Sequence, residues 1–110
     1  MTVQINENMA INAPLPSTDG DPGWLAVHDE LRVLHIEKSA DYGNENDALA
    51  NYVLTSEAVG EVDEYTCWLR IHEKTVRAIN LLRAGRGDEN KEGVDVACIA
   101  VAAEALRRRR

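Results

Sequence analysis

The sequence lacks long apolar runs and has few cysteines. No apolar run reaches the roughly 18 residues that a membrane-spanning helix requires, and the N-terminus has no basic and apolar segments of the kind found in a secretory signal. The two cysteines, Cys67 and Cys98, lie inside helical patterns and share no metal-ligand spacing with each other or with histidine. These absences predict a cytoplasmic protein with reduced thiols and no membrane partner.

Several catalytic and nucleotide-binding signatures are also missing. The stretch AGRGDEN at residues 84–90 has neither the glycine spacing nor the terminal Lys-Ser/Thr of a P-loop. No Ser-His-Asp arrangement follows from residue spacing. No segment alternates between apolar and polar residues over a length typical of a strand, so the chain is predicted to be all-α.

The charge balance is acidic but uneven. The net charge is −7, although four of the twelve basic residues are the terminal arginines 107–110, so the rest of the chain is more acidic still. An acidic body repels phosphate backbones, which argues against stable nucleic-acid binding. The arginine run either complements the dipole of a last helix or acts as a small electrostatic anchor.

Helical periodicity and capping residues predict three long helices and a short one. Pro22 suits the first turn of a helix capped by Asp21, and Gly43 and Gly85 suit helix ends. Residues 1–21 read as a flexible arm and 22–110 as one small domain, whose bundle we expect to be completed by oligomerisation. The expected helices span about residues 24–40, 47–54, 61–85 and 90–107.

Two acidic pairs share one spacing. Glu61 and Glu64 are three residues apart at the start of the long helix, and Glu92 and Asp95 are three apart at the start of the last. Residues at this spacing project from one side of a helix, and both pairs continue into apolar faces. Inward carboxylates are costly unless they are paired or hold a cation, which predicts a divalent metal site. The alternative is that they only complement the helix dipoles.

The order of these motifs resembles MazG-like nucleotide pyrophosphohydrolases of the all-α NTP pyrophosphatase superfamily. The acidic pairs resemble the ExxE…ExxD pattern, and EKSADYGNENDALANY and HEKTVRAINLL are similar to small phage-encoded members. The resemblance covers roughly residues 24–107. One departure is that the first family motif often lies well inside a helix, whereas Glu61 directly follows Gly60. If Glu61 lies in a loop, Glu64 either pairs with Glu57 or has no acidic partner.

The resemblance implies cleavage of a nucleoside triphosphate to a monophosphate and pyrophosphate, dependent on Mg²⁺ or Mn²⁺. It also implies a homo-oligomer, a dimer or larger. The alternative is a non-catalytic helical oligomer that binds a nucleotide or signalling molecule, or that engages a host protein. The implied metal ligands are Glu61, Glu64, Glu92 and Asp95, with Glu64 and Asp95 as the catalytic residues.

Six further residues are candidate nucleotide contacts by the same resemblance, and each has a structural alternative. Lys38 would otherwise pair with Asp41 or Glu37, and Tyr42 would pack at the helix end. Asn51 would serve in capping or packing. The basic pair on the long helix would otherwise form an exposed ladder with Glu73. The six candidates are Lys38, Asp41, Tyr42, Asn51, Lys74 and Arg77.

Overall fold

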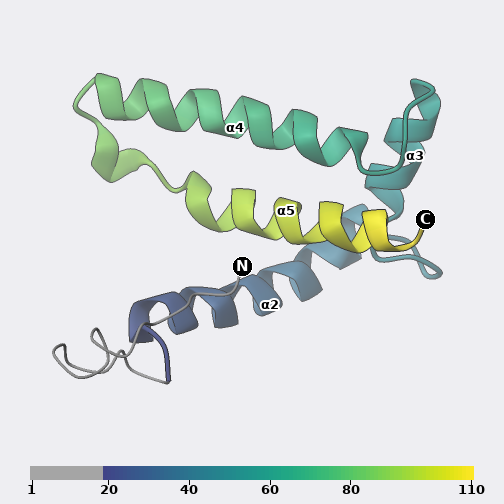
Figure 1. Cartoon of the computed structure of the whole chain (residues 1–110), viewed down its shortest axis with the longest axis horizontal. Coiled ribbons are helices and arrows are strands. Elements are labelled where there is room, and N and C mark those ends of the chain that lie inside the picture. Colours follow the sequence, from purple (N-terminus) through teal and green to yellow (C-terminus); the bar gives the residue numbers. More distant parts are fainter. Residues whose placement is uncertain (1–18) are drawn as a thin grey trace, which may run out of the picture.

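The computed structural model describes residues 19–110, which form four α-helices and one short 3-10 turn, without strands (Figure 1). The predicted all-α class, with three long helices and one shorter helix, is confirmed. The predicted N-terminal arm lies almost entirely outside the described residues. The elements are α2 (Pro22–Tyr42), α3 (Ala50–Ala58), α4 (Tyr65–Arg83), η1 (Gly87–Glu89) and α5 (Glu92–Arg108).

Local signals set both ends of α2, as the sequence predicts. The Asp21 carboxylate accepts a hydrogen bond from the backbone N–H of Trp24 at 2.8 Å, and Pro22 occupies the first turn. At the other end, the N–H of Gly43 donates to the Ser39 carbonyl at 3.0 Å. A Cβ atom at Gly43 would lie 2.7 Å from that carbonyl oxygen and 2.8 Å from the Ala48 Cα, so only glycine fits this turn.

The corner between α3 and α4 differs from the prediction. The short helix begins later and runs longer than expected, and α4 begins at Tyr65 rather than near Glu61. Buried Ser56 holds this corner, because its hydroxyl donates to the Asp63 carbonyl (3.0 Å) and accepts from the Thr66 N–H (3.1 Å). The two hydroxyls of Ser56 and Thr66 are also hydrogen-bonded, at 2.7 Å. The chain before Tyr65 is therefore held in a turn.

Helix α5 lies between α4 and α2, and α4 and α5 run antiparallel (Figure 1). Gly85 ends the α4 segment with φ of +71°, a left-handed conformation that favours glycine. The core is small and gathers on α5, where Leu106 is 1% exposed, and Cys67 of α4 is fully buried against it. The remaining core residues are Leu49, Ile99, Ala102 and Ala103.

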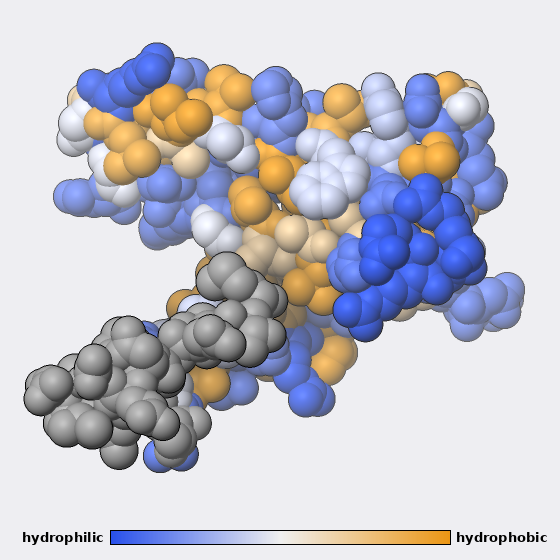
Figure 2. Space-filling model, in the orientation of Figure 1, coloured by the Kyte–Doolittle hydropathy of each residue, from blue (hydrophilic) through white to orange (hydrophobic). Residues whose placement is uncertain are grey.

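A single chain leaves much apolar surface uncovered. Helix α4 also carries exposed apolar residues that form its outward face: Trp68 is 53% and Ile79 is 42% exposed, and Leu69 and Val76 are exposed too. Figure 2 shows hydrophobic residues at the surface in several places among hydrophilic ones. Within residues 19–110, no helix is both long enough and apolar enough to cross a bilayer.

Candidate functional site: a mixed-charge cleft

The first acidic residues of α5 form a cluster of ion pairs with cations from α2 and α4. The Lys74 ammonium contacts Glu92 Oε2 at 3.3 Å and Asp95 Oδ2 at 3.2 Å. Lys38 Nζ lies 3.2 Å from Asp95 Oδ1, and Arg77 Nε lies 3.3 Å from Glu92 Oε1. Each of the four carboxylate oxygens therefore has a cationic partner.

Helix geometry explains this arrangement. Residues 74 and 77 are three apart on α4, and residues 92 and 95 are three apart on α5, so each pair shares one side of its helix. Because α4 and α5 are antiparallel, the basic pair faces the acidic pair across the helix interface. The Asn90 side-chain oxygen accepts a hydrogen bond from the Glu92 N–H at 3.2 Å. This bond lies at the first residue of α5, so the helix begins at the level where Glu92 and Asp95 face the cations of α2 and α4.

Burial and ion pairing act in opposite directions on the titration of this cluster. Burial by itself raises the pKa of Asp95, but hydrogen bonds from Lys38 and Lys74 outweigh it, and the net pKa lies below the ordinary value. Burial likewise favours a lower pKa for Lys74, whereas its bonds to Asp95 and Glu92 raise that pKa above the ordinary value. Both groups are charged at neutral pH, so the contact between Lys74 and Asp95 is an ion pair.

The cluster borders a cleft of about 90 Å³ to which all four helices contribute. Of the candidates from the sequence, Lys38, Asn51, Lys74 and Asp95 line it together, whereas Glu92 and its partner Arg77 are not among the lining residues. Cations outnumber carboxylates at this site, in a chain whose net charge is −7. The cleft therefore favours an anion.

Four further residues line the cleft without having been predicted as site residues: Tyr52, Arg70, Cys98 and Ile99. Arg70 is four residues before Lys74, so helical spacing places both on one face of α4, and that signal was available in the sequence. Tyr52 follows Asn51 on α3, but only the packing of α3 against α4 brings it to the cleft. It adds an aromatic ring beside the amide of Asn51.

The four carboxylates expected to share one ion are not brought together within a single chain. Glu61 is exposed and precedes α4, while Glu64 is at its N-terminus, where it pairs with Arg110 and accepts from the Trp68 indole at 3.4 Å. About 15 Å of helix separates Glu64 from Lys74, the partner of Asp95. Within residues 19–110, no group of three or more His, Cys, Asp or Glu side chains is placed to hold a metal ion.

The physical reason is the antiparallel packing of α4 and α5. It places the start of α4 beside the end of α5, so the two acidic pairs lie at opposite ends of the helix pair. The α4 residues that face the α5 carboxylates are instead the cations Lys74 and Arg77. The expected convergence of four carboxylates is corrected to a pairing of two carboxylates with three basic side chains.

The remaining candidates lie outside the cleft or outside the described side chains. Asp41 is exposed near the end of α2 and does not line the cleft. Tyr42 is the last residue of α2, and its side chain is outside the part of the chain that the structure describes. The alternative pairings of Lys38 with Asp41 or Glu37 and of Lys74 with Glu73 are replaced by bonds to α5.

Comparisons with protein-family models, with curated proteins and with solved structures find no match to this chain. The described residues establish an all-α protein of four helices with a mixed-charge cleft. Its function therefore has to follow from the chemistry of that cleft.

Proposed function

We propose that the cleft binds a nucleoside triphosphate through its phosphates, together with Mg²⁺, and that the protein hydrolyses the bond between the α and β phosphates with one water molecule, giving a monophosphate and pyrophosphate. The observation that carries this proposal is the convergence of Lys38 and Lys74, with Arg70, on one cleft beside an aromatic ring and an amide. Lysine ammonium groups bind phosphate oxygens as point charges. Tyr52 and Asn51 offer stacking and hydrogen bonding to a base.

The existing ion pairs are suited to exchange partners when a phosphate enters. The side chains of Lys38 and Lys74 are 38% and 28% exposed, and ion pairs in contact with water contribute little stability. Breaking the exposed pair of Lys38 with Asp95 therefore costs little free energy, whereas Lys74 also leaves Glu92, whose side chain is only 11% exposed. A triphosphate carries more charge than the carboxylates it displaces, so the lysines gain by moving to its oxygens.

The carboxylates thus released fit a magnesium ion. Mg²⁺ in phosphate-handling sites takes one or two carboxylates and completes its shell with phosphate oxygens and water. Glu92 and Asp95 supply that donor set, and Mn²⁺ accepts the same ligands. When bound, such an ion supplies charge neutralisation and a more acidic water. Glu61 and Glu64 take no part in this version of the site.

A second candidate is nucleotide binding without turnover. Glu64, a predicted catalytic residue, lies at the far end of α4 beside Arg110. The lowered pKa of Asp95 makes that carboxylate a weak proton acceptor at neutral pH. These observations favour a protein that sequesters a nucleotide or signalling molecule on the same cleft.

The outward apolar face of α4 supports a homo-oligomer as part of either function. Trp68, Val76 and Ile79 follow one another at helical spacing and stay exposed. Contiguous apolar patches of several hundred Å² on soluble chains mark interaction surfaces. We expect this face to pack against a second copy. Sedimentation equilibrium of wild type and Val76→Glu tests this, with a shift to monomer expected in the variant.

Nucleotide binding is tested by calorimetry with a panel of NTPs and dNTPs. Lys74→Gln should weaken binding at least roughly tenfold, and Lys91→Gln, an exposed lysine outside the cleft, should leave it unchanged. Asp95→Asn should strengthen triphosphate binding in EDTA, because it frees Lys38 and leaves Lys74 with Glu92 as its only carboxylate partner, and weaken it in Mg²⁺. Equal nucleotide affinities for Lys74→Gln, Lys91→Gln and Asp95→Asn would contradict the proposal.

Pyrophosphate release under the same conditions separates the two candidates. Turnover that is lost in Glu92→Gln and retained in Glu64→Gln supports hydrolysis at the cleft. Binding without product from any triphosphate selects the non-catalytic protein. Far-UV circular dichroism and the melting temperature of each variant show that it is folded.

A further inference from the structure

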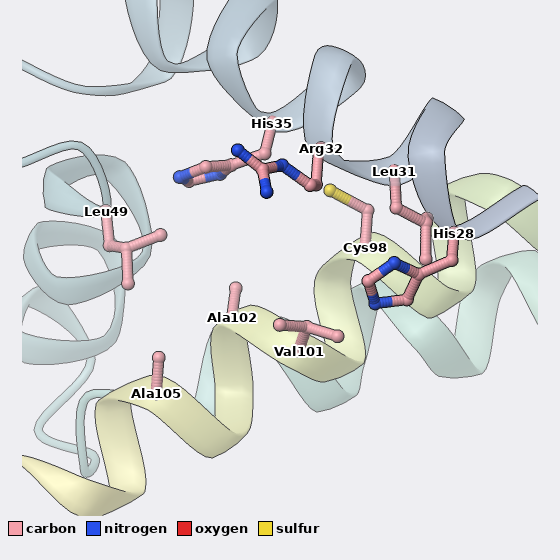
Figure 3. Close-up of a pocket in the computed structure, with 9 residues that line it drawn as sticks. All are labelled: His28, Leu31, Arg32, His35, Leu49, Cys98, Val101, Ala102 and Ala105. Atoms are coloured by element: carbon pink, nitrogen blue, oxygen red, sulfur yellow. The ribbon is translucent and has the colours of Figure 1, made fainter. Parts of the chain in front are cut away.

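A second cavity, of about 230 Å³, lies between α2 and α5 (Figure 3). It exists because the residues of α5 that face α2 here are short: Cys98, Ala102 and Ala105 do not fill the space between the helices. Leu49, just before α3, closes one side. Of its lining residues, only Cys98 also lines the mixed-charge cleft.

The walls of this cavity are chemically unequal. Leu49, Leu31 and Val101 contribute apolar side chains from three segments around the cavity, whereas Arg32 and His35 of α2 extend together over it, as Figure 3 shows. No acidic residue lines the cavity, although the chain carries a net charge of −7. Among residues 19–110, Arg32 takes part in no salt bridge. The guanidinium is thus available to an incoming anion.

We propose that this cavity binds a small amphipathic anion: an apolar ring or short acyl group that carries a carboxylate or sulfonate. The apolar body would lie against Leu49 and Val101, and the head would accept hydrogen bonds from Arg32 and His35. A partner helix, about 10 Å across, is too large for this space. The site is distinct from the proposed nucleotide site, whose cations Lys38 and Lys74 line the other cleft, although Cys98 lines both.

The protein carries a built-in reporter for this site. Trp24 stacks on His28, with ring centroids 5.4 Å apart and an interplanar angle of 20°, and His28 lines the cavity. The only other tryptophan is Trp68, on the outward face of α4. A Trp68→Phe background therefore assigns all tryptophan emission to Trp24. Energy transfer from Trp24 to a bound fluorophore then reports occupation of the cavity.

The test uses 1-anilinonaphthalene-8-sulfonate, an apolar fluorophore with an anionic head, on the Trp68→Phe protein. We expect saturable binding of one molecule per chain with transfer from Trp24. Arg32→Gln should weaken it roughly tenfold, and Ala105→Leu, which fills the cavity, should abolish it. Arg83→Gln is the matched control, because Arg83 lies at the end of α4 and away from the cavity. N-phenyl-1-naphthylamine, the uncharged analogue, should bind wild type and Arg32→Gln equally.

Several results would overturn the proposal. Binding that is unaffected by both Arg32→Gln and Ala105→Leu would place the fluorophore elsewhere, for example on the outward face of α4. Displacement by Mg²⁺ and a nucleoside triphosphate would assign it to the mixed-charge cleft. A cavity closed by self-association would show as binding that disappears when protein concentration rises. Failure of nucleotide binding alone would leave this site untouched, so the two proposals are tested separately.

Discussion

Replacing Ser56 by alanine should unfold the corner that positions α4. The Ser56 side chain is fully buried, and its hydroxyl bonds to three groups: the carbonyl of Asp63, the N–H of Thr66 and the hydroxyl of Thr66. Each neutral hydrogen bond contributes about 1 kcal/mol net, and a buried group left unpaired costs about 1–3 kcal/mol. Because alanine leaves a carbonyl and an N–H without this partner, the loss should be about 2–4 kcal/mol.

Thr66→Val provides the matched comparison. It removes only the bond between the two hydroxyls and keeps the shape of the side chain, so about 1 kcal/mol should be lost. Urea unfolding followed by circular dichroism measures both, since a loss of 3 kcal/mol lowers the midpoint by about 2 M when the slope is about 1.5 kcal/mol/M. If Ser56→Ala costs no more than Thr66→Val, the hydroxyl does not organise this corner.

Three further predictions concern a turn, the ion-pair cluster and a thiol. Gly43→Ala should lower the melting temperature, because the new Cβ would lie 2.7 Å from the Ser39 carbonyl oxygen. An unchanged melting temperature would show that the backbone of this turn can shift at little cost in free energy. The folded-state pKa of Asp95 is below its unfolded value, so its stabilising contribution is full above the unfolded pKa and is lost as pH falls below about 4. In Asp95→Asn, the free energy of unfolding should accordingly fall less steeply than in wild type as the pH is lowered through about 4. Burial raises the pKa of the Cys67 thiol to about 11, so Ellman's reagent should leave Cys67 unmodified until denaturant is added; prompt labelling of Cys67 in the native protein, located by mass spectrometry, would be contrary to this.

Most helix ends could be predicted from capping residues close to them in the sequence. The other ends are set by contacts between residues farther apart in the chain. Asp21, Pro22 and Gly85 act on the backbone within a few residues, so their effect is readable from the chain itself. The start of α4 depends on a hydroxyl of α3 that has no recognisable pattern in sequence. For that reason Glu61 reads as a helix residue in the sequence but precedes the helix in the structure.

The candidate site shows the same division. The spacing of residues on one helix is a local property. The sequence therefore correctly predicts that Lys74 and Arg77 share one side of their helix, and that Glu92 and Asp95 share one side of theirs. Which pair faces which depends on the direction in which α4 and α5 pack. Because they are antiparallel, Asp95 meets Lys74, and Glu64 meets Arg110 instead.

By itself, the sequence determined that this protein is all-α, where most helices end, and which side chains share a helical face, because these follow from backbone conformation and a period of 3.6 residues. Only the tertiary structure decided that the two acidic pairs stay apart, that lysines from two helices neutralise one of them, and that short residues on α5 leave a cavity beside Arg32. These features join residues far apart in the chain, and their distances depend on how the helices cross.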